Sequence, residues 1–139
     1  MKIKITLLIF AAIALFCGTS LTAMAGQPVG ALVQTPNDSK LYIMVPVGKA
    51  AHIPTVRVLQ CLRLQNRAHT IISQAELNSY PKTELLLQSR AGAIYMIKGD
   101  KKHHIVNAAA FQRRNLDPNT VLPMMDDQLN CLQDGAPLN

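Results

Sequence analysis

The sequence of 139 residues contains no tryptophan and few aromatic residues of any kind, with three tyrosines and three phenylalanines. Proteins use aromatic rings to stack on sugars and on single-stranded bases. Their scarcity disfavours recognition of carbohydrates and of specific nucleic-acid sequences. Charged residues are also few, 16% of the chain, whereas 49% are apolar. This balance excludes a disordered polyelectrolyte, and the length excludes a large multidomain enzyme.

Familiar catalytic and metal-binding patterns are missing as well. The chain has no Gly-x-Ser-x-Gly elbow and no His-Glu-x-x-His motif, and its carboxylates are scattered along the sequence. We therefore expect a protein that is not an enzyme and that binds no metal or cofactor. The weaker alternative is a small secreted hydrolase of ribonuclease or phosphodiesterase type. It would use His103 as general acid or base and Lys101 or Lys102 to stabilise developing charge.

The first 25 residues have the pattern of a signal peptide. Lys2 and Lys4 give a basic start, residues 5–17 form an apolar run broken only by Thr6, and small residues stand at 23 and 25. We expect cleavage after Ala25, and a periplasmic or secreted mature protein. The run is shorter than the roughly 20 residues that a membrane span needs, so we expect no transmembrane segment in the mature chain.

Export affects how the cysteines are interpreted. Removal of the leader takes away Cys17 and leaves Cys61 and Cys131 in a compartment that permits oxidation. We predict an intramolecular disulfide between them, which stabilises the fold by about 4 kcal/mol on the chain-entropy model. Two free thiols serving a metal or catalysis are the alternative. It is disfavoured because no further cysteine or histidine cluster stands at ligand spacing.

Two segments of the mature chain resemble each other. LYIMV at 41–45, GK at 48–49 and HIP at 52–54 have counterparts in IYMIK at 94–98, KK at 101–102 and HIV at 104–106. Further on, ELN at 76–78 matches QLN at 128–130, so the offset stays at 52 to 53 residues. This pattern predicts two copies of one unit within one compact domain, with boundaries at 26–83 and 84–139.

Each copy has the same order of local signals. An apolar, β-branched run with a turn predicts a hairpin, and Thr55 or Asn107 then opens a short helix as its N-cap. A second extended piece follows, and a last helical turn opens at Ser73, through a capping box, or at Asp126. We predict an α+β fold of two ββαβα-like units. The units should share one core, because about 50 residues bury too little apolar surface alone.

The combination of tyrosine, an apolar pair, Gly-Lys, His-Ile-Pro, a short helix and Glu-Leu-Asn-Ser-Tyr-Pro resembles a tandem repeat of exported bacterial envelope and secreted proteins. That repeat has no assigned chemistry. The second copy departs from it, with Val106 in place of the proline and Leu132 and Gln133 in place of Tyr-Pro. The resemblance implies an extracellular accessory or binding role rather than catalysis.

The histidines differ in whether they have a counterpart in the other copy. His52 and His104 stand at the same place in both, which favours a structural role in the hairpin. His103 is adjacent to His104, and neighbouring strand residues point to opposite faces, so the pair is a poor site for one metal ion. His69 has no counterpart, and we expect it to lie in a solvated loop.

Basic residues give the stronger functional hypothesis. The candidate ligand-binding residues are Lys98, Lys101, Lys102, His103, Arg113 and Arg114. If the copies pack with pseudo-twofold symmetry, these residues and the cations of copy one would form a continuous positive surface. The simpler interpretation is that they only solvate the exterior.

The hypothesis is a non-enzymatic protein that binds phosphorylated lipid headgroups or an acidic envelope polymer. The alternative is a protein–protein interaction module of the envelope, or a secreted effector. An exposed apolar patch across both copies would favour it.

Overall fold

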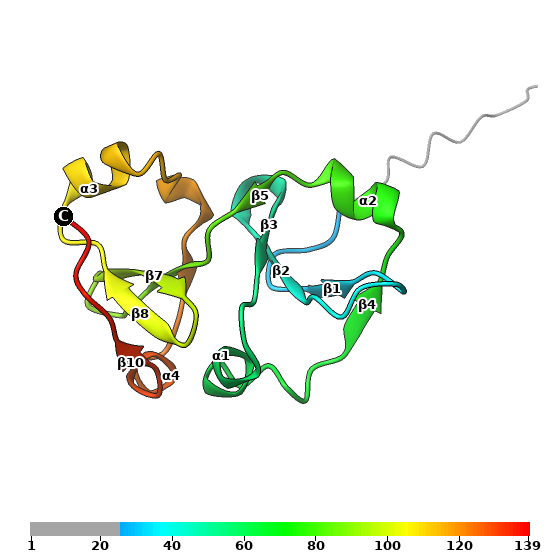
Figure 1. The fold of residues 1–139 in the computed structure, drawn as a ribbon, viewed down its shortest axis with the longest axis horizontal. Helices are drawn as coiled ribbons and strands as arrows, with labels where there is room; N and C mark the ends of the chain where they lie inside the picture. The colour runs from blue at the N-terminus through cyan, green and yellow to red at the C-terminus, as the bar shows by residue number, and fades with distance from the viewer. Residues whose placement is uncertain (1–25) are drawn as a thin grey trace, which may run out of the picture.

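The computed structural model describes residues 26–139, so the predicted signal peptide and Cys17 lie outside the described residues. The described chain is an α+β fold of two five-stranded sheets and four short helices. The sheets lie side by side as two units, and strand β5 leads from the first to the second (Figure 1). Within 26–139, no helix is both long and apolar enough to cross a membrane.

Unit 1 contains five strands, two α-helices and one turn of 3₁₀ helix. In chain order these are β1 Leu32–Gln34, β2 Tyr42–Val45, η1 Pro46–Gly48, β3 Lys49–His52, α1 Val56–Cys61, β4 His69–Ile71, α2 Gln74–Ser79 and β5 Lys82–Thr83. The sheet order is β4-β1-β2-β3-β5. The three central strands are antiparallel, and β4 and β5 join the two edges in parallel.

Unit 2 has the same topology. Its elements are β6 Leu86–Gln88, β7 Ile94–Lys98, β8 Lys101–His104, α3 Ala108–Arg113, η2 Pro118–Thr120, β9 Leu122–Pro123, α4 Asp126–Asn130 and β10 Gln133–Asp134. The order β9-β6-β7-β8-β10 reproduces that of unit 1, with the same strand directions. The α+β prediction is confirmed, although each unit has a first and a last strand that the sequence pattern did not indicate.

Local capping explains where the helices begin. The Thr55 hydroxyl accepts a hydrogen bond from the Val58 amide at 3.2 Å, and Asn107 does the same for α3 at 2.9 Å. Ser73 caps α2 as expected. The prediction for Asp126 was wrong, because Asp126 is already the first residue of α4. The N-cap position is Met125, whose amide donates to the side chain of Gln128.

The largest core lies between the units and confirms the predicted shared interior. It joins the α1 side of sheet 1 to the α4 side of sheet 2, including Val45, Ala51, Val58 and Leu62 from unit 1 and Leu87, Ile97, Leu129 and Leu132 from unit 2. The α2 side of unit 1 and the α3 side of unit 2 keep small separate cores. Different faces of the two units therefore meet. The packing is head-to-tail, not the pseudo-twofold arrangement considered above.

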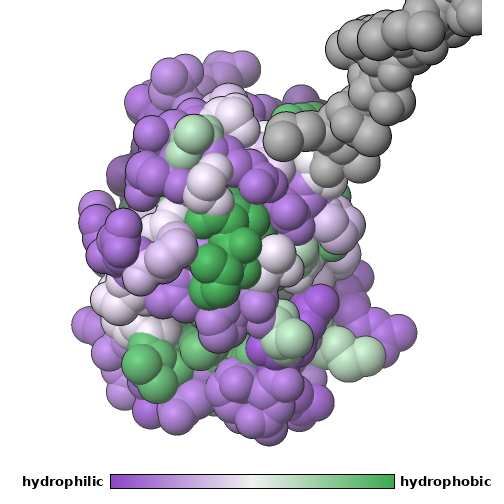
Figure 2. Space-filling view, turned by 90° about the vertical axis from the view of Figure 1, so that its right-hand side faces the viewer, coloured by the Kyte–Doolittle hydropathy of each residue, from purple (hydrophilic) through white to green (hydrophobic). Residues whose placement is uncertain are grey.

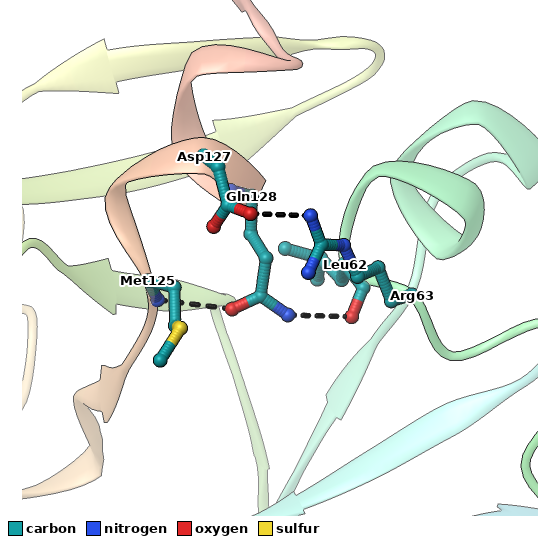
Figure 3. A network of polar contacts seen from close by, with 5 residues as sticks. All are labelled: Leu62, Arg63, Met125, Asp127 and Gln128. Atoms are coloured by element: carbon teal, nitrogen blue, oxygen red, sulfur yellow. Dashed lines mark hydrogen bonds and ion pairs between the residues drawn. The ribbon is translucent and has the colours of Figure 1, made fainter.

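Polar and covalent contacts reinforce the junction between units. The predicted disulfide joins Cys61 at the end of α1 to Cys131 after α4, with Cα atoms 5.4 Å apart. Beside it the Gln128 side chain donates to the Leu62 carbonyl at 2.8 Å, and Arg63 forms an ion pair with Asp127 (Figure 3). These contacts hold the last turn of α1 against α4.

Candidate functional site

Lys102 belongs to the interior rather than to the surface that its sequence context suggested. Its side chain is only 8% exposed, and its ammonium donates to the Leu132 carbonyl at 3.0 Å. The same nitrogen pairs with Asp134 at 2.7 Å and lies 5.7 Å from the centre of the Tyr95 ring. These contacts use the ammonium within the chain and leave Lys102 unsuited to hold an external anion.

In unit 1 a lysine ammonium lies at the equivalent position, but this lysine belongs to a different strand. Lys82 of β5 donates to the Tyr80 carbonyl at 2.7 Å and lies 5.7 Å from the Tyr42 ring centre. Tyr80 and Leu132 follow equivalent helices. In the parallel strand pairs, Ala50 faces Lys82, whereas Lys102 faces Asp134. The ammonium is thus supplied from β5 in unit 1 and from β8 in unit 2. Partial burial lowers the pKa of Lys82.

The remaining basic candidates are exposed but do not form one cluster. Lys98 and Lys101 flank the turn between β7 and β8, and Arg113 and Arg114 end α3, at the opposite end of unit 2 (Figure 1). Arg114 instead lines a depression of about 500 Å³ at the unit junction, together with Lys49 and Lys82. The structure therefore divides the predicted basic surface into separate regions.

Comparison of the units explains why these cations are exposed. Strand pairing and helix caps make Lys98, His103, Arg113 and Arg114 equivalent to Val45, Ala51, Cys61 and Leu62. All four unit 1 residues are buried in the shared core. In unit 2 no further unit within 26–139 packs on this side, so Lys98, Arg113 and Arg114 are exposed and His103 is only half-buried.

His52 and His104 each face the tyrosine of their own hairpin, whereas His69, which was expected in a solvated loop, is the first residue of strand β4. His52 faces Tyr42 across the β2–β3 pair, and His104 faces Tyr95 in unit 2, each with ring centres 5.4 Å apart. His103 is half-buried, and its Nδ1 lies 2.9 Å from the Ala136 carbonyl. Within the described part of the chain, no group of three or more His, Cys, Asp or Glu residues could hold a metal ion.

A pocket of about 520 Å³ in unit 1 is the stronger candidate site. It lies beside the N-terminal half of α1, next to β1 and β4. Leu32, Leu41, Ile53, Leu59 and Leu64 give it an apolar lining. Its volume is within the range usual for ligand pockets, about 300–1,000 Å³. We call it pocket 1.

The rim of pocket 1 carries positive charge. The charge comes from Lys40 and Arg67, which line the pocket beside His52 and His69, and none of its lining residues among the described ones is a carboxylate. An apolar interior with a cationic rim fits a group that is itself partly apolar and partly anionic.

Unit 2 has an equivalent pocket that lacks this charge. Pocket 2, of about 540 Å³, lies beside α3 and is lined by Ile94, Ile105, Phe111 and Leu116, the counterparts of Leu41, Ile53, Leu59 and Leu64. The counterparts of Lys40 and Arg67 are Ala93 and Asn119, neither of which is charged, whereas His104, the counterpart of His52, lines this pocket too. Charge therefore distinguishes two pockets of similar shape.

Neither Lys40 nor Arg67 was among the candidate ligand-binding residues, and Arg67 was considered only as one of the cations of copy one that would extend a shared positive surface. The sequence does distinguish Arg67, because it has no basic counterpart in the second copy. Residues matched between the copies mostly serve the fold, whereas an unmatched cation can serve recognition. The separation of Lys40 from Arg67 by 27 positions concealed that both line one pocket.

No protein-family model matches the chain, and no curated protein matches it. Among solved structures it is similar to a chain of the periplasmic assembly from the ESX-5 inner membrane complex, with a TM-score of 0.32 and 11% identity. The match covers 81% of this chain and 42% of that chain, so this chain spans less than half of its length. A likeness of this size carries no argument about function.

Proposed function

We propose that this chain is a non-enzymatic binding module that recognises an acidic segment of a partner protein outside the cytosol. Pocket 1 receives an apolar side chain of that segment, and its cationic rim holds neighbouring carboxylates. The Cys61–Cys131 disulfide supports an oxidising compartment. We thus prefer the protein–protein interaction module to binding of an anionic surface, which was the first hypothesis from the sequence alone.

One observation carries the proposal: pocket 1 joins an apolar lining to a rim of Lys40 and Arg67. Both side chains belong to exposed residues, and neither takes part in an ion pair within 26–139. Apolar burial supplies most of the binding energy at such sites, and the charges choose among partners and accelerate encounter. A purely anionic ligand would leave the apolar lining unused.

Selection from a displayed library of random hexapeptides on immobilised protein (residues 26–139) tests the proposal. We expect enrichment of sequences that combine Leu, Ile or Val with Asp or Glu. Arg67→Glu should abolish the enrichment, whereas Arg57→Glu should not, because Arg57 is exposed on α1 but does not line pocket 1. No enrichment, or equal enrichment on both variants, would refute the proposal.

The anionic-surface hypothesis is the second candidate. Lys98, Lys101, Arg113 and Arg114 are exposed, and no carboxylate of residues 26–139 lies within ion-pair distance of them. Vesicles containing phosphatidylglycerol, compared with phosphatidylcholine alone at two salt concentrations, provide the test. Binding that weakens with salt and with Lys98→Ala/Lys101→Ala would support it. Equal binding to both vesicle types would exclude it.

A further inference from the structure

Among the described residues, no strand pairs with the outer side of β4, which forms an open edge of unit 1 beside pocket 1. It is the terminal strand of sheet 1, all three of its residues are exposed, and Ile71 is 54% exposed. In Figure 1, β4 lies on the side of unit 1 away from unit 2. Figure 2 looks onto that side and shows hydrophobic groups set within a largely hydrophilic surface. An exposed edge with an apolar, β-branched residue is a template for pairing with another strand.

The hydrogen bonds of β4 show which groups are free to pair. The Ile72 amide donates to the Gln34 carbonyl of β1 at 2.9 Å. Alternate residues of a parallel strand bond to the same neighbour, so His69 and Ile71 direct their backbone N–H and C=O groups toward the open side. Their side chains lie on the face of Leu32 and Gln34, with which they are in register. Leu32, Gln34 and His69 all line pocket 1.

The equivalent edge of unit 2 lacks one of these outward donors. The Met124 amide donates to the Gln88 carbonyl at 2.9 Å, which makes Met124 equivalent to Ile72 and Pro123 equivalent to Ile71. Proline has no N–H, so the outward donor is missing there. β9 is also one residue shorter than β4. Of the two matched edges, only that of unit 1 can donate to an added strand at this position.

We infer that the partner segment binds as an additional strand on β4, extended and acidic. The inference rests on the proposed function and specifies its mode of binding. Backbone groups of His69 and Ile71 bond to the added strand, and every second side chain of that strand lies on the face of pocket 1. Arg67 and Lys40 line that face and pair with its carboxylates. Affinity comes from the backbone pairing and the apolar pocket, and specificity comes from the charge.

The chain itself supplies the test substitution. Ile71→Pro removes the outward N–H while keeping the inward bonds of β4, as Pro123 does in unit 2. We expect Ile71→Pro to weaken a selected hexapeptide about tenfold, the upper effect of one backbone hydrogen bond. Ile71→Val, the control, keeps the N–H and should bind within about twofold of the wild type. Equal affinity of Ile71→Pro and Ile71→Val would overturn the strand mode while leaving peptide binding, and so the proposed function, intact.

Two further measurements test the strand mode without the proline variant and test whether a second copy of the chain occupies the edge. Two versions of the selected peptide are N-methylated at alternate amides, one at the odd and one at the even positions. One version should no longer bind the wild-type protein, and the other should bind it normally. This result does not depend on how the proline variant folds. Normal binding of both versions would overturn the inference. Analytical ultracentrifugation should show that the protein is a monomer. If it is a dimer that Ile71→Pro dissociates, a second copy of the chain occupies the edge, and the inference of an acidic partner segment is overturned.

Discussion

The two units take the ammonium at this matched point from different strands, and this gives a stability prediction centred on the buried Lys102. In Lys102→Ala, the Leu132 carbonyl loses a charged donor, a loss of about 1.5–3 kcal/mol. The contact with the Tyr95 ring adds about 0.5–2 kcal/mol. The Asp134 pair adds less than about 1 kcal/mol, because that carboxylate is 80% exposed. These terms share one nitrogen and do not add fully, so we expect a loss of about 3 kcal/mol in the free energy of unfolding.

A second substitution that restores stability to Lys102→Ala tests the equivalence of the two ammonium positions more directly than the loss alone. Lys102→Ala/Asp134→Lys recreates in unit 2 the pair that unit 1 already has, with Ala50 opposite Lys82. The new ammonium can reach the Leu132 carbonyl from β10, as Lys82 reaches the Tyr80 carbonyl from β5. We expect the double variant to recover about half of the loss, although Asp134→Lys adds positive charge to a basic chain.

Urea unfolding followed by far-ultraviolet circular dichroism measures these differences and suits a chain without tryptophan. Lys101→Ala is the matched control, because Lys101 is the exposed neighbour on the same strand, and it should cost less than about 0.5 kcal/mol. A double variant no more stable than Lys102→Ala would refute the equivalence of the two ammonium positions. So would a Lys102→Ala loss no larger than that of the control.

Three other variants test the junction and the backbone. Replacing Cys61 and Cys131 by serine should lower the free energy of unfolding by about 4 kcal/mol, and a reductant should destabilise the wild type but not the variant in urea. The hydrogen bond from Lys49 lowers the pKa of Asp117, so that its contribution is complete above the ordinary carboxyl pKa near 4 and is lost as pH falls through the lower folded-state value. The stability gap between wild type and Asp117→Asn should therefore close in acid, and a gap that is constant from pH 7 to pH 2 would contradict this. Val47 has a φ of 61°, a left-handed conformation costly for a β-branched residue, so Val47→Gly should raise the melting temperature and stabilise by about 0.5 kcal/mol.

Local signals in the sequence predicted the units well, because short-range chemistry decides their elements. Thr55 and Asn107 cap the helices as their side chains require, and the two hairpins pair tyrosine with histidine in equivalent places. The first and last strands of each unit escaped prediction, because pairing partners distant in sequence define a strand only two or three residues long. Lys102 was placed on the surface for a related reason. Whether a lysine is buried depends on the carbonyl and ring that surround it in the fold.

The sequence alone determined the α+β class, the pairing of Cys61 with Cys131 and the correspondence of the two units, since composition, capping and offset are properties of the chain itself. Only the tertiary structure decided that the units stack head-to-tail, with the α1 side of unit 1 against the α4 side of unit 2. That choice depends on which apolar faces fit each other. It buries positions in unit 1 whose counterparts in unit 2 are cationic and exposed. No local pattern encodes this relation between distant surfaces.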